Sequence, residues 1–169
     1  MKGLIRKILK EQTSKTVLVV FGGIRYATAK FMLTQIPDRI KKNRIIIAKE
    51  YNTNINEVID ELNEIEYTTL EVTGFSAGGY NVFKLAKKVD VDFLGLIDPA
   101  IPADWSLEGF PSGHNSVLFF NNDNWGGYPG IKERQMELSL KMQFKGMDVV
   151  EENIGHEYFP LRFFTKYIN

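Results

Sequence analysis

The chain has 169 residues, of which 44% are hydrophobic and 25% charged, values typical of a soluble globular protein built as one domain. Its 21 basic and 21 acidic side chains balance, which argues against a nucleic-acid partner, because such binding needs a basic excess. There is no cysteine, which excludes disulfides, zinc–thiolate sites and cysteine nucleophiles. We therefore expect a single domain over residues 1–169.

The amino-terminal segment, residues 1–10, alternates apolar and basic residues. The charges at Arg6, Lys7 and Lys10 interrupt the apolar stretch that a secretory signal requires, and no apolar run is long enough to cross a bilayer. We expect a short helix docked on the core, with a membrane-surface role as the alternative. The predicted location is the cytoplasm, without stable membrane insertion.

Short apolar runs rich in β-branched and aromatic residues predict strands, and apolar residues at helical spacing predict helices. In chain order we predict strands at 17–21 and 44–48, a helix at 56–65, a strand at 69–73, a helix at 77–89, strands at 93–97 and 117–121, a helix at 131–144, a strand at 147–151 and a helix at 158–167. This alternation predicts an α/β fold. We expect a three-layer sandwich, whose mostly parallel sheet of about six strands carries helices on both faces.

One long stretch, residues 99–115, interrupts this rhythm. It contains Pro99, Pro102 and Pro111 together with two glycines, so we expect it to be mainly irregular. A loop of this length inside a small domain is usually functional. It follows the carboxyl end of a strand, which is where open α/β sheets bind their ligands.

The strand at 69–73 runs into Gly74-Phe75-Ser76-Ala77-Gly78, and a predicted helix follows. This is the Gly-x-Ser-x-Gly pattern in the strand–turn–helix context of a nucleophile elbow. The two glycines avoid a clash in the sharp turn, and the serine hydroxyl projects above the sheet. Free N–H groups at the start of the helix favour negative charge that develops there. The pattern therefore predicts Ser76 as a nucleophile.

On this motif the chain resembles the α/β-hydrolase superfamily, in particular its small esterase, thioesterase and lipase-like members. The resemblance runs from about residue 17 to the end, without the first two strands and the large cap of bigger relatives. In this family the nucleophilic serine is followed along the chain by an acid and then by a histidine. The fold that the resemblance implies is a minimal α/β-hydrolase fold.

The chain has two histidines, so the general base is either His114 or His156. His114 precedes the strand at 117–121 and is expected near the amino-terminal edge of the sheet, whereas the elbow serine stands at the carboxyl edge. His156 follows the last predicted strand, on the same side as Ser76, where the family has its histidine. We predict His156 as the base and His114 as a structural or loop residue.

Two aspartates compete for the place of the acid, which orients the imidazole and stabilises its charged form. Asp98 ends the strand at 93–97 and precedes the rigid Pro99, whereas Asp123 follows the next strand in an asparagine-rich turn. The family usually places its acid after the penultimate strand, which favours Asp123. Some thioesterase-like and lipase-like members place it one strand earlier. We favour Asp98 and keep Asp123 as the alternative.

The resemblance also implies an oxyanion hole made of two backbone N–H groups. Ala77 supplies one by its position after the serine. The other is expected from the loop after the first strand, where Gly22-Gly23 resembles the oxyanion glycines of the family, so the donor is Gly23 or Ile24.

Aromatic residues gather in the loops that follow the strands, and they suit an acyl chain or an aromatic group. Among them we predict that Phe75, Trp105 and Trp125 bind the substrate.

Together these residues predict a serine hydrolase that cleaves a small-molecule ester or thioester through an acyl-enzyme intermediate. This reaction needs no cofactor, and two distant histidines without cysteine predict no metal site. The alternatives are an acyltransferase, or a non-catalytic binding protein that has the same fold.

Overall fold

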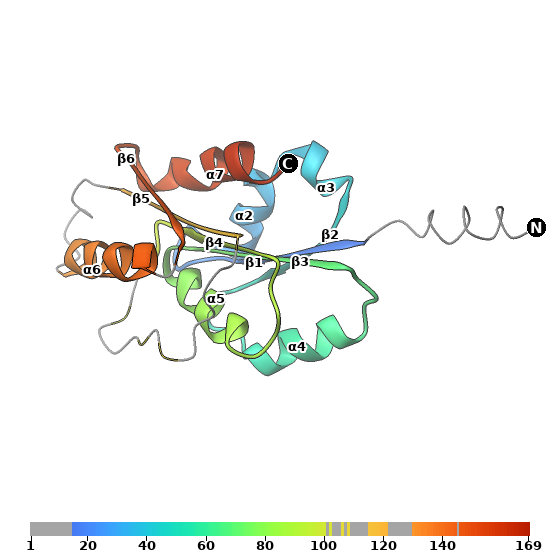
Figure 1. The fold of residues 1–169 in the computed structure, drawn as a ribbon. Helices are drawn as coiled ribbons and strands as arrows, with labels where there is room; N and C mark the ends of the chain where they lie inside the picture. Colours follow the sequence, from blue (N-terminus) through green and yellow to red (C-terminus); the bar gives the residue numbers. More distant parts are fainter. Residues whose placement is uncertain are drawn as a thin grey trace, which may run out of the picture.

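The computed structural model describes residues 15–100, 102, 106, 108, 115–121, 130–144 and 146–169. Fourteen secondary-structure elements follow one another along this part of the chain (Figure 1). They are β1 (Thr16–Phe21), α2 (Ala29–Gln35), α3 (Asp38–Lys41), β2 (Arg44–Lys49), α4 (Ile55–Asn63), β3 (Thr69–Phe75), η1 (Ser76–Gly78), α5 (Gly79–Ala86), β4 (Phe93–Ile97), β5 (Asn115–Asn121), α6 (Ile131–Phe144), β6 (Asp148–Glu152), η2 (His156–Tyr158) and α7 (Phe159–Tyr167).

The six strands form one sheet in the order β2-β1-β3-β4-β5-β6, and every neighbouring pair is parallel. Helices α2, α3 and α7 lie on one face, and α4 and α5 lie on the other (Figure 1). Leu138 of α6 belongs to the same apolar cluster as α4 and α5. The predicted three-layer α/β sandwich is therefore confirmed, with a sheet that is parallel throughout.

The strand order places a topological switch point between β1 and β3. The chain leaves β1 toward one edge of the sheet to make β2, and after β3 it proceeds toward the other edge. Loops that leave adjacent strands in opposite directions open a gap at the carboxyl edge, and ligands of open α/β sheets bind there. The two loops that border this gap are residues 22–28 and the turn that begins at Ser76.

Two short helices, α2 and α3, were not predicted from the sequence. The side chain of Thr28 accepts a hydrogen bond from the N–H of Phe31 and so caps the start of α2. The helix ends before Pro37, because a proline disfavours helical backbone in the residue that precedes it. Seven residues leave little room for an apolar repeat, so periodicity does not reveal this helix.

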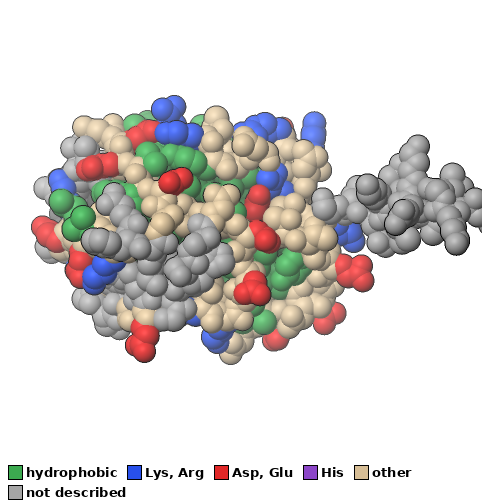
Figure 2. Space-filling view, viewed as in Figure 1, with side chains coloured by type: hydrophobic (Ala, Val, Ile, Leu, Met, Phe, Trp, Pro, Cys, Tyr) green, Lys and Arg blue, Asp and Glu red, His purple; other side chains and the backbone are tan. Residues whose placement is uncertain are grey.

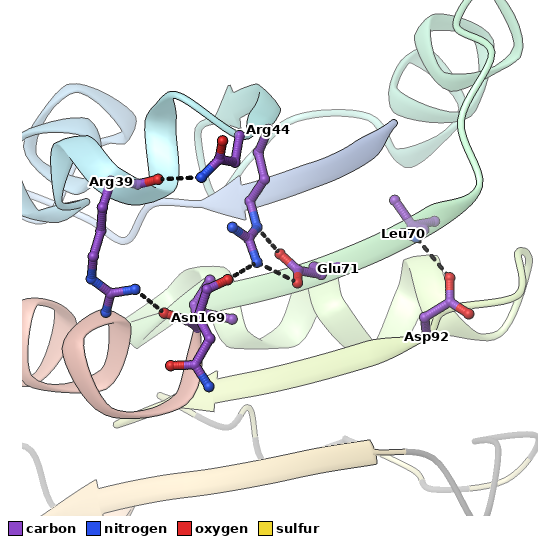
Figure 3. Close-up of polar contacts among 8 residues, drawn as sticks. Arg39, Arg44, Leu70, Glu71, Asp92 and Asn169 are labelled. Carbon is purple, nitrogen blue, oxygen red and sulfur yellow. Dashed lines mark hydrogen bonds and ion pairs between the residues drawn. The ribbon is translucent and has the colours of Figure 1, made fainter. Parts of the chain in front are cut away.

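The amino-terminal edge of the sheet is joined by polar contacts to the end of the chain (Figure 3). Arg44 reaches across β1 and makes two hydrogen bonds with the Glu71 carboxylate, at 2.6 and 3.0 Å. Arg44 also donates to the carbonyl of Asn169, and Arg39 donates to those of Thr165 and Ile168. These contacts fix the carboxyl-terminal end of α7, the helix that directly follows His156.

We expect Arg44→Met to destabilise the protein by about 3–5 kcal/mol, because it leaves Glu71 buried without its counter-charge. The Arg44 and Glu71 side chains are only 9% and 12% exposed. Urea unfolding followed by circular dichroism measures this loss. The double variant Arg44→Met/Glu71→Met should regain most of the stability, since no unpaired charge remains. A loss below about 1 kcal/mol in the single variant would mean that water already screens this pair.

Acidic and basic side chains both occur over the face shown in Figure 2, in keeping with the balanced charge of the sequence. No helix among the described residues has the length and hydrophobicity that crossing a bilayer requires.

Candidate active site

Ser76 stands where β3 ends, in a sharp turn that leads into α5. A Cβ atom built on Gly74 would lie 2.4 Å from the carbonyl oxygen of Gly78, and one built on Gly78 would lie 2.4 Å from that of Gly22. Both glycines are therefore required by the close approach of the backbone. The turn has the geometry that the Gly-x-Ser-x-Gly pattern predicted.

Backbone strain concentrates at this edge of the sheet. In the described part of the chain, the non-glycine residues with positive φ are Arg25, Ser76 and Asp98, at 57°, 54° and 38°. They lie in the segments that follow β1, β3 and β4, which are neighbours in the sheet. Such conformations cost about 1–3 kcal/mol each and cluster at functional sites, because the surrounding structure must hold them in place.

Asp98 and His156 are brought together, although 58 positions separate them in the sequence. Nδ1 of His156 lies 2.5 Å from Oδ2 of Asp98. The Asp98 side chain is fully buried, whereas that of His156 is 21% exposed. Because an ionised carboxylate only accepts hydrogen bonds, the imidazole carries its proton on Nδ1. The neutral ring then has its lone pair on Nε2, which is the form that can accept a proton.

The imidazole of His156 packs against Phe75, the residue before Ser76. The two ring centroids are 4.4 Å apart and the planes are inclined by 32°. The ring of Tyr26 lies edge-on to the imidazole, with the two ring centroids 6.4 Å apart. The ring of Phe75 and the carboxylate of Asp98 thus hold the His156 imidazole beside the end of β3.

The loop after β1 lies directly beside the serine. A Cβ atom on Gly23 would come within 3.1 Å of Oγ of Ser76. The N–H of Gly23 donates to the carbonyl of Ala27, so it is engaged within its own loop. Of the two predicted donors, the geometry therefore favours Ile24, whose N–H has no hydrogen bond among the described residues. Ala77 directly follows Ser76 in the turn η1.

Two polar residues that the sequence analysis did not single out support these groups. The carboxylate of Glu50 accepts the N–H of Ala29 and so fixes the far end of the loop that contains Gly23. Gln135 of α6 donates to Oδ1 of Asp98. The sequence signal was the spacing of three positions from Leu138, which places this glutamine on the same face of the predicted helix as an apolar residue.

The remaining predicted residues fall into two groups. His114, Trp105, Asp123 and Trp125 lie outside the described residues. Phe75, predicted to bind substrate, is completely buried, and its observed contact is with the imidazole. Within the described part of the chain, no three His, Asp or Glu residues are grouped as metal ligands.

A hollow of about 690 Å³ lined by Lys15, Lys42 and Asn169 lies at the amino-terminal edge, opposite Ser76. We assign it no part in the chemistry.

Comparison with known proteins shows which fold this is. No family model matches the sequence, and no curated protein matches it. Among solved structures, Est1E from Butyrivibrio proteoclasticus superposes with a TM-score of 0.61 at 12% identity, covering 89% of this chain and 83% of Est1E. The chain has the α/β-hydrolase fold. A thioesterase domain from the curacin biosynthetic pathway superposes with a TM-score of 0.56 at 10% identity, covering 86% of this chain and 87% of that domain. This α/β-hydrolase fold places Ser76 and the Asp98–His156 pair at the carboxyl edge of its sheet.

Proposed function

We propose that this protein is a serine hydrolase that cleaves a carboxylic ester or thioester through an acyl-enzyme intermediate. One observation carries the proposal. The imidazole of His156 bonds to the buried Asp98 through Nδ1 and packs on the residue that precedes Ser76. A serine together with an imidazole that a carboxylate orients forms the catalytic unit of serine hydrolases.

In the first half of the reaction, Nε2 of His156 removes the proton from Oγ of Ser76 as the oxygen attacks the substrate carbonyl. The negative oxygen of the tetrahedral intermediate accepts hydrogen bonds from the N–H groups of Ala77 and Ile24. The bond to the leaving group then breaks, and the imidazolium gives its proton to the departing alcohol or thiol. Asp98 stabilises the imidazolium throughout.

In the second half, a water molecule replaces the leaving group. Nε2 of His156 takes one of its protons while the oxygen attacks the acyl-enzyme. Collapse of the second intermediate releases the carboxylic acid and returns the proton to Ser76. None of these steps uses a cofactor.

The residues around the imidazole suggest the class of substrate. Tyr26 and Ile24 are 53% and 38% exposed and lie in the loop beside Ser76. Exposed apolar surface next to a reactive serine favours an apolar acyl group over a highly charged one. Because one structural neighbour is a thioesterase domain, thioesters belong in the substrate panel beside oxygen esters.

The test is covalent labelling combined with turnover. The purified protein should hydrolyse a short p-nitrophenyl ester, and a fluorophosphonate should stop this reaction by forming one adduct, which peptide mapping places on Ser76. Acid release from a short acyl thioester tests the second bond type. A folded protein that takes no label and releases no acid from either substrate would favour a binding protein with this fold.

A further inference from the structure

The side chain of Gln135 is fully buried beside the proposed acid. Its Nε2 atom lies 3.0 Å from Oδ1 of Asp98 and 2.9 Å from the carbonyl oxygen of Pro99. Both neighbours are acceptors, so the –NH₂ end of the amide must face them. The opposite orientation would bring the amide oxygen against a carboxylate and a carbonyl. The chemistry of these neighbours therefore determines which way the amide points.

This arrangement leaves Oε1 of Gln135 buried without a hydrogen bond to the described residues. A buried polar atom without a partner lowers stability, so packing alone does not account for an amide here. The benefit lies at Asp98, whose backbone is strained and whose N–H donates to Phe119 at 2.6 Å. The hydrogen bond to Phe119 holds the backbone of Asp98. The hydrogen bond from Gln135 acts on the side chain and fixes the plane of its carboxylate.

Building on the proposed function, we propose that Gln135 is a positioning residue that fixes the carboxylate of Asp98 and thereby the tautomer of His156. Gln135 occupies Oδ1, and the imidazole occupies Oδ2. The amide donates without adding charge, so Asp98 remains the acceptor that holds the proton on Nδ1. The hydrogen bonds of Gln135 go to Asp98 and to the carbonyl of Pro99, so it acts on the site through Asp98.

The proposal makes a specific prediction about an amide at position 98. In Asp98→Asn, the –NH₂ group of Gln135 still requires an acceptor, so the oxygen of the new amide turns toward α6. Its –NH₂ group then faces Nδ1 of His156 and selects the tautomer that carries the proton on Nε2. That tautomer cannot accept the serine proton, and turnover should fall by about 10⁴-fold.

Adding Gln135→Glu to Asp98→Asn should reverse the orientation of the new amide and with it the tautomer of His156. A neutral carboxyl group at position 135 donates its O–H to the Pro99 carbonyl and accepts from the –NH₂ group of the new amide. The oxygen of that amide then faces Nδ1–H of His156 and restores the productive tautomer. We expect the double variant to exceed Asp98→Asn in kcat by about tenfold or more.

The matched control adds a carboxyl group elsewhere on α6. Met136 is the neighbour of Gln135 and is 52% exposed. Met136→Glu in the Asp98→Asn background should recover no activity. If it recovers as much as Gln135→Glu, the effect is a general one of charge and the proposal is wrong. Gln135→Met, which keeps the length and removes the donor, should lower kcat about 10- to 100-fold and change KM little. Unchanged kcat in this variant would also overturn the proposal.

The second readout does not depend on activity. In a Ser76→Ala/His114→Asn background, only His156 contributes imidazole signals, and the ¹⁵N shifts of its ring report which nitrogen carries the proton. For the neutral form of the ring, we expect the proton on Nδ1 in this background, on Nε2 after Asp98→Asn, and on Nδ1 again in the double variant. Asp98→Asn with the proton still on Nδ1 would refute the role of Gln135. The two proposals can fail separately. If the tautomers are as expected but the wild-type protein hydrolyses neither esters nor thioesters, the role of Gln135 stands and the hydrolase proposal is wrong.

Discussion

Ser76→Ala is expected to lower the turnover of a p-nitrophenyl ester by about 10⁵-fold or more, because loss of the nucleophile removes the acyl-enzyme pathway. Residual hydrolysis would come from the oxyanion donors and from substrate binding alone. The change removes one hydroxyl group from a turn whose glycines remain, so unfolding free energy should change by at most about 1 kcal/mol.

Steady-state kinetics and fluorophosphonate labelling measure this effect together, with circular dichroism to show that the variant folds. Ser139→Ala is the matched control, since Ser139 lies on α6 and its hydroxyl bonds to the carbonyl of Met136. That variant should keep both turnover and labelling. Labelling that persists in Ser76→Ala would mean that another residue is the nucleophile.

Asp98→Asn is expected to reduce turnover by about 10⁴-fold while Asp123→Asn keeps most of it. The buried carboxylate at position 98 holds the proton on Nδ1 of His156 and balances the imidazolium that forms when Ser76 attacks. An amide there loses the charge, and Gln135 turns it so that its –NH₂ group faces the imidazole. Asp123→Asn is the matched control, because it makes the same change at the alternative acid.

The measurement is kcat on the same ester at neutral pH, with thermal unfolding as the check on folding. A large loss in Asp123→Asn and a small one in Asp98→Asn would move the acid to Asp123 and leave the serine hydrolase proposal standing. Wild-type turnover in both variants would indicate a Ser76–His156 dyad.

The carboxyl edge of the sheet shows which features of the site local sequence patterns can predict. Buried parallel strands are continuous apolar runs, so β1 and β4 were visible in the sequence as blocks of five residues, 17–21 and 93–97. The elbow around Ser76 was equally visible, because a sharp turn between a strand and a helix needs glycine where backbones approach most closely. Both signals arise from neighbours in the chain, and the sequence displays them directly.

Contacts between segments that are distant in the chain could not be predicted from these local patterns. The sequence left Asp98 and Asp123 as competing acids, because each follows a strand and the pattern contains no information on side-chain direction. The structure brings Asp98 to His156 through the positive φ of Asp98 and the anchoring of α7, whose Phe163 fits against Gly95. Our proposal of Ile24 over Gly23 as oxyanion donor similarly rests on a hydrogen bond within the loop, from Gly23 to Ala27.

The sequence by itself determined the class of fold, the turn that carries Ser76 and the side of the sheet on which His156 lies, because hydrophobic periodicity and glycine placement are local consequences of backbone geometry. Only the tertiary structure decided which carboxylate meets the imidazole and that Gln135 holds it from α6. A hydrogen bond between side chains depends on distances of a few tenths of an ångström across packed elements, and such distances are set by how the whole core packs.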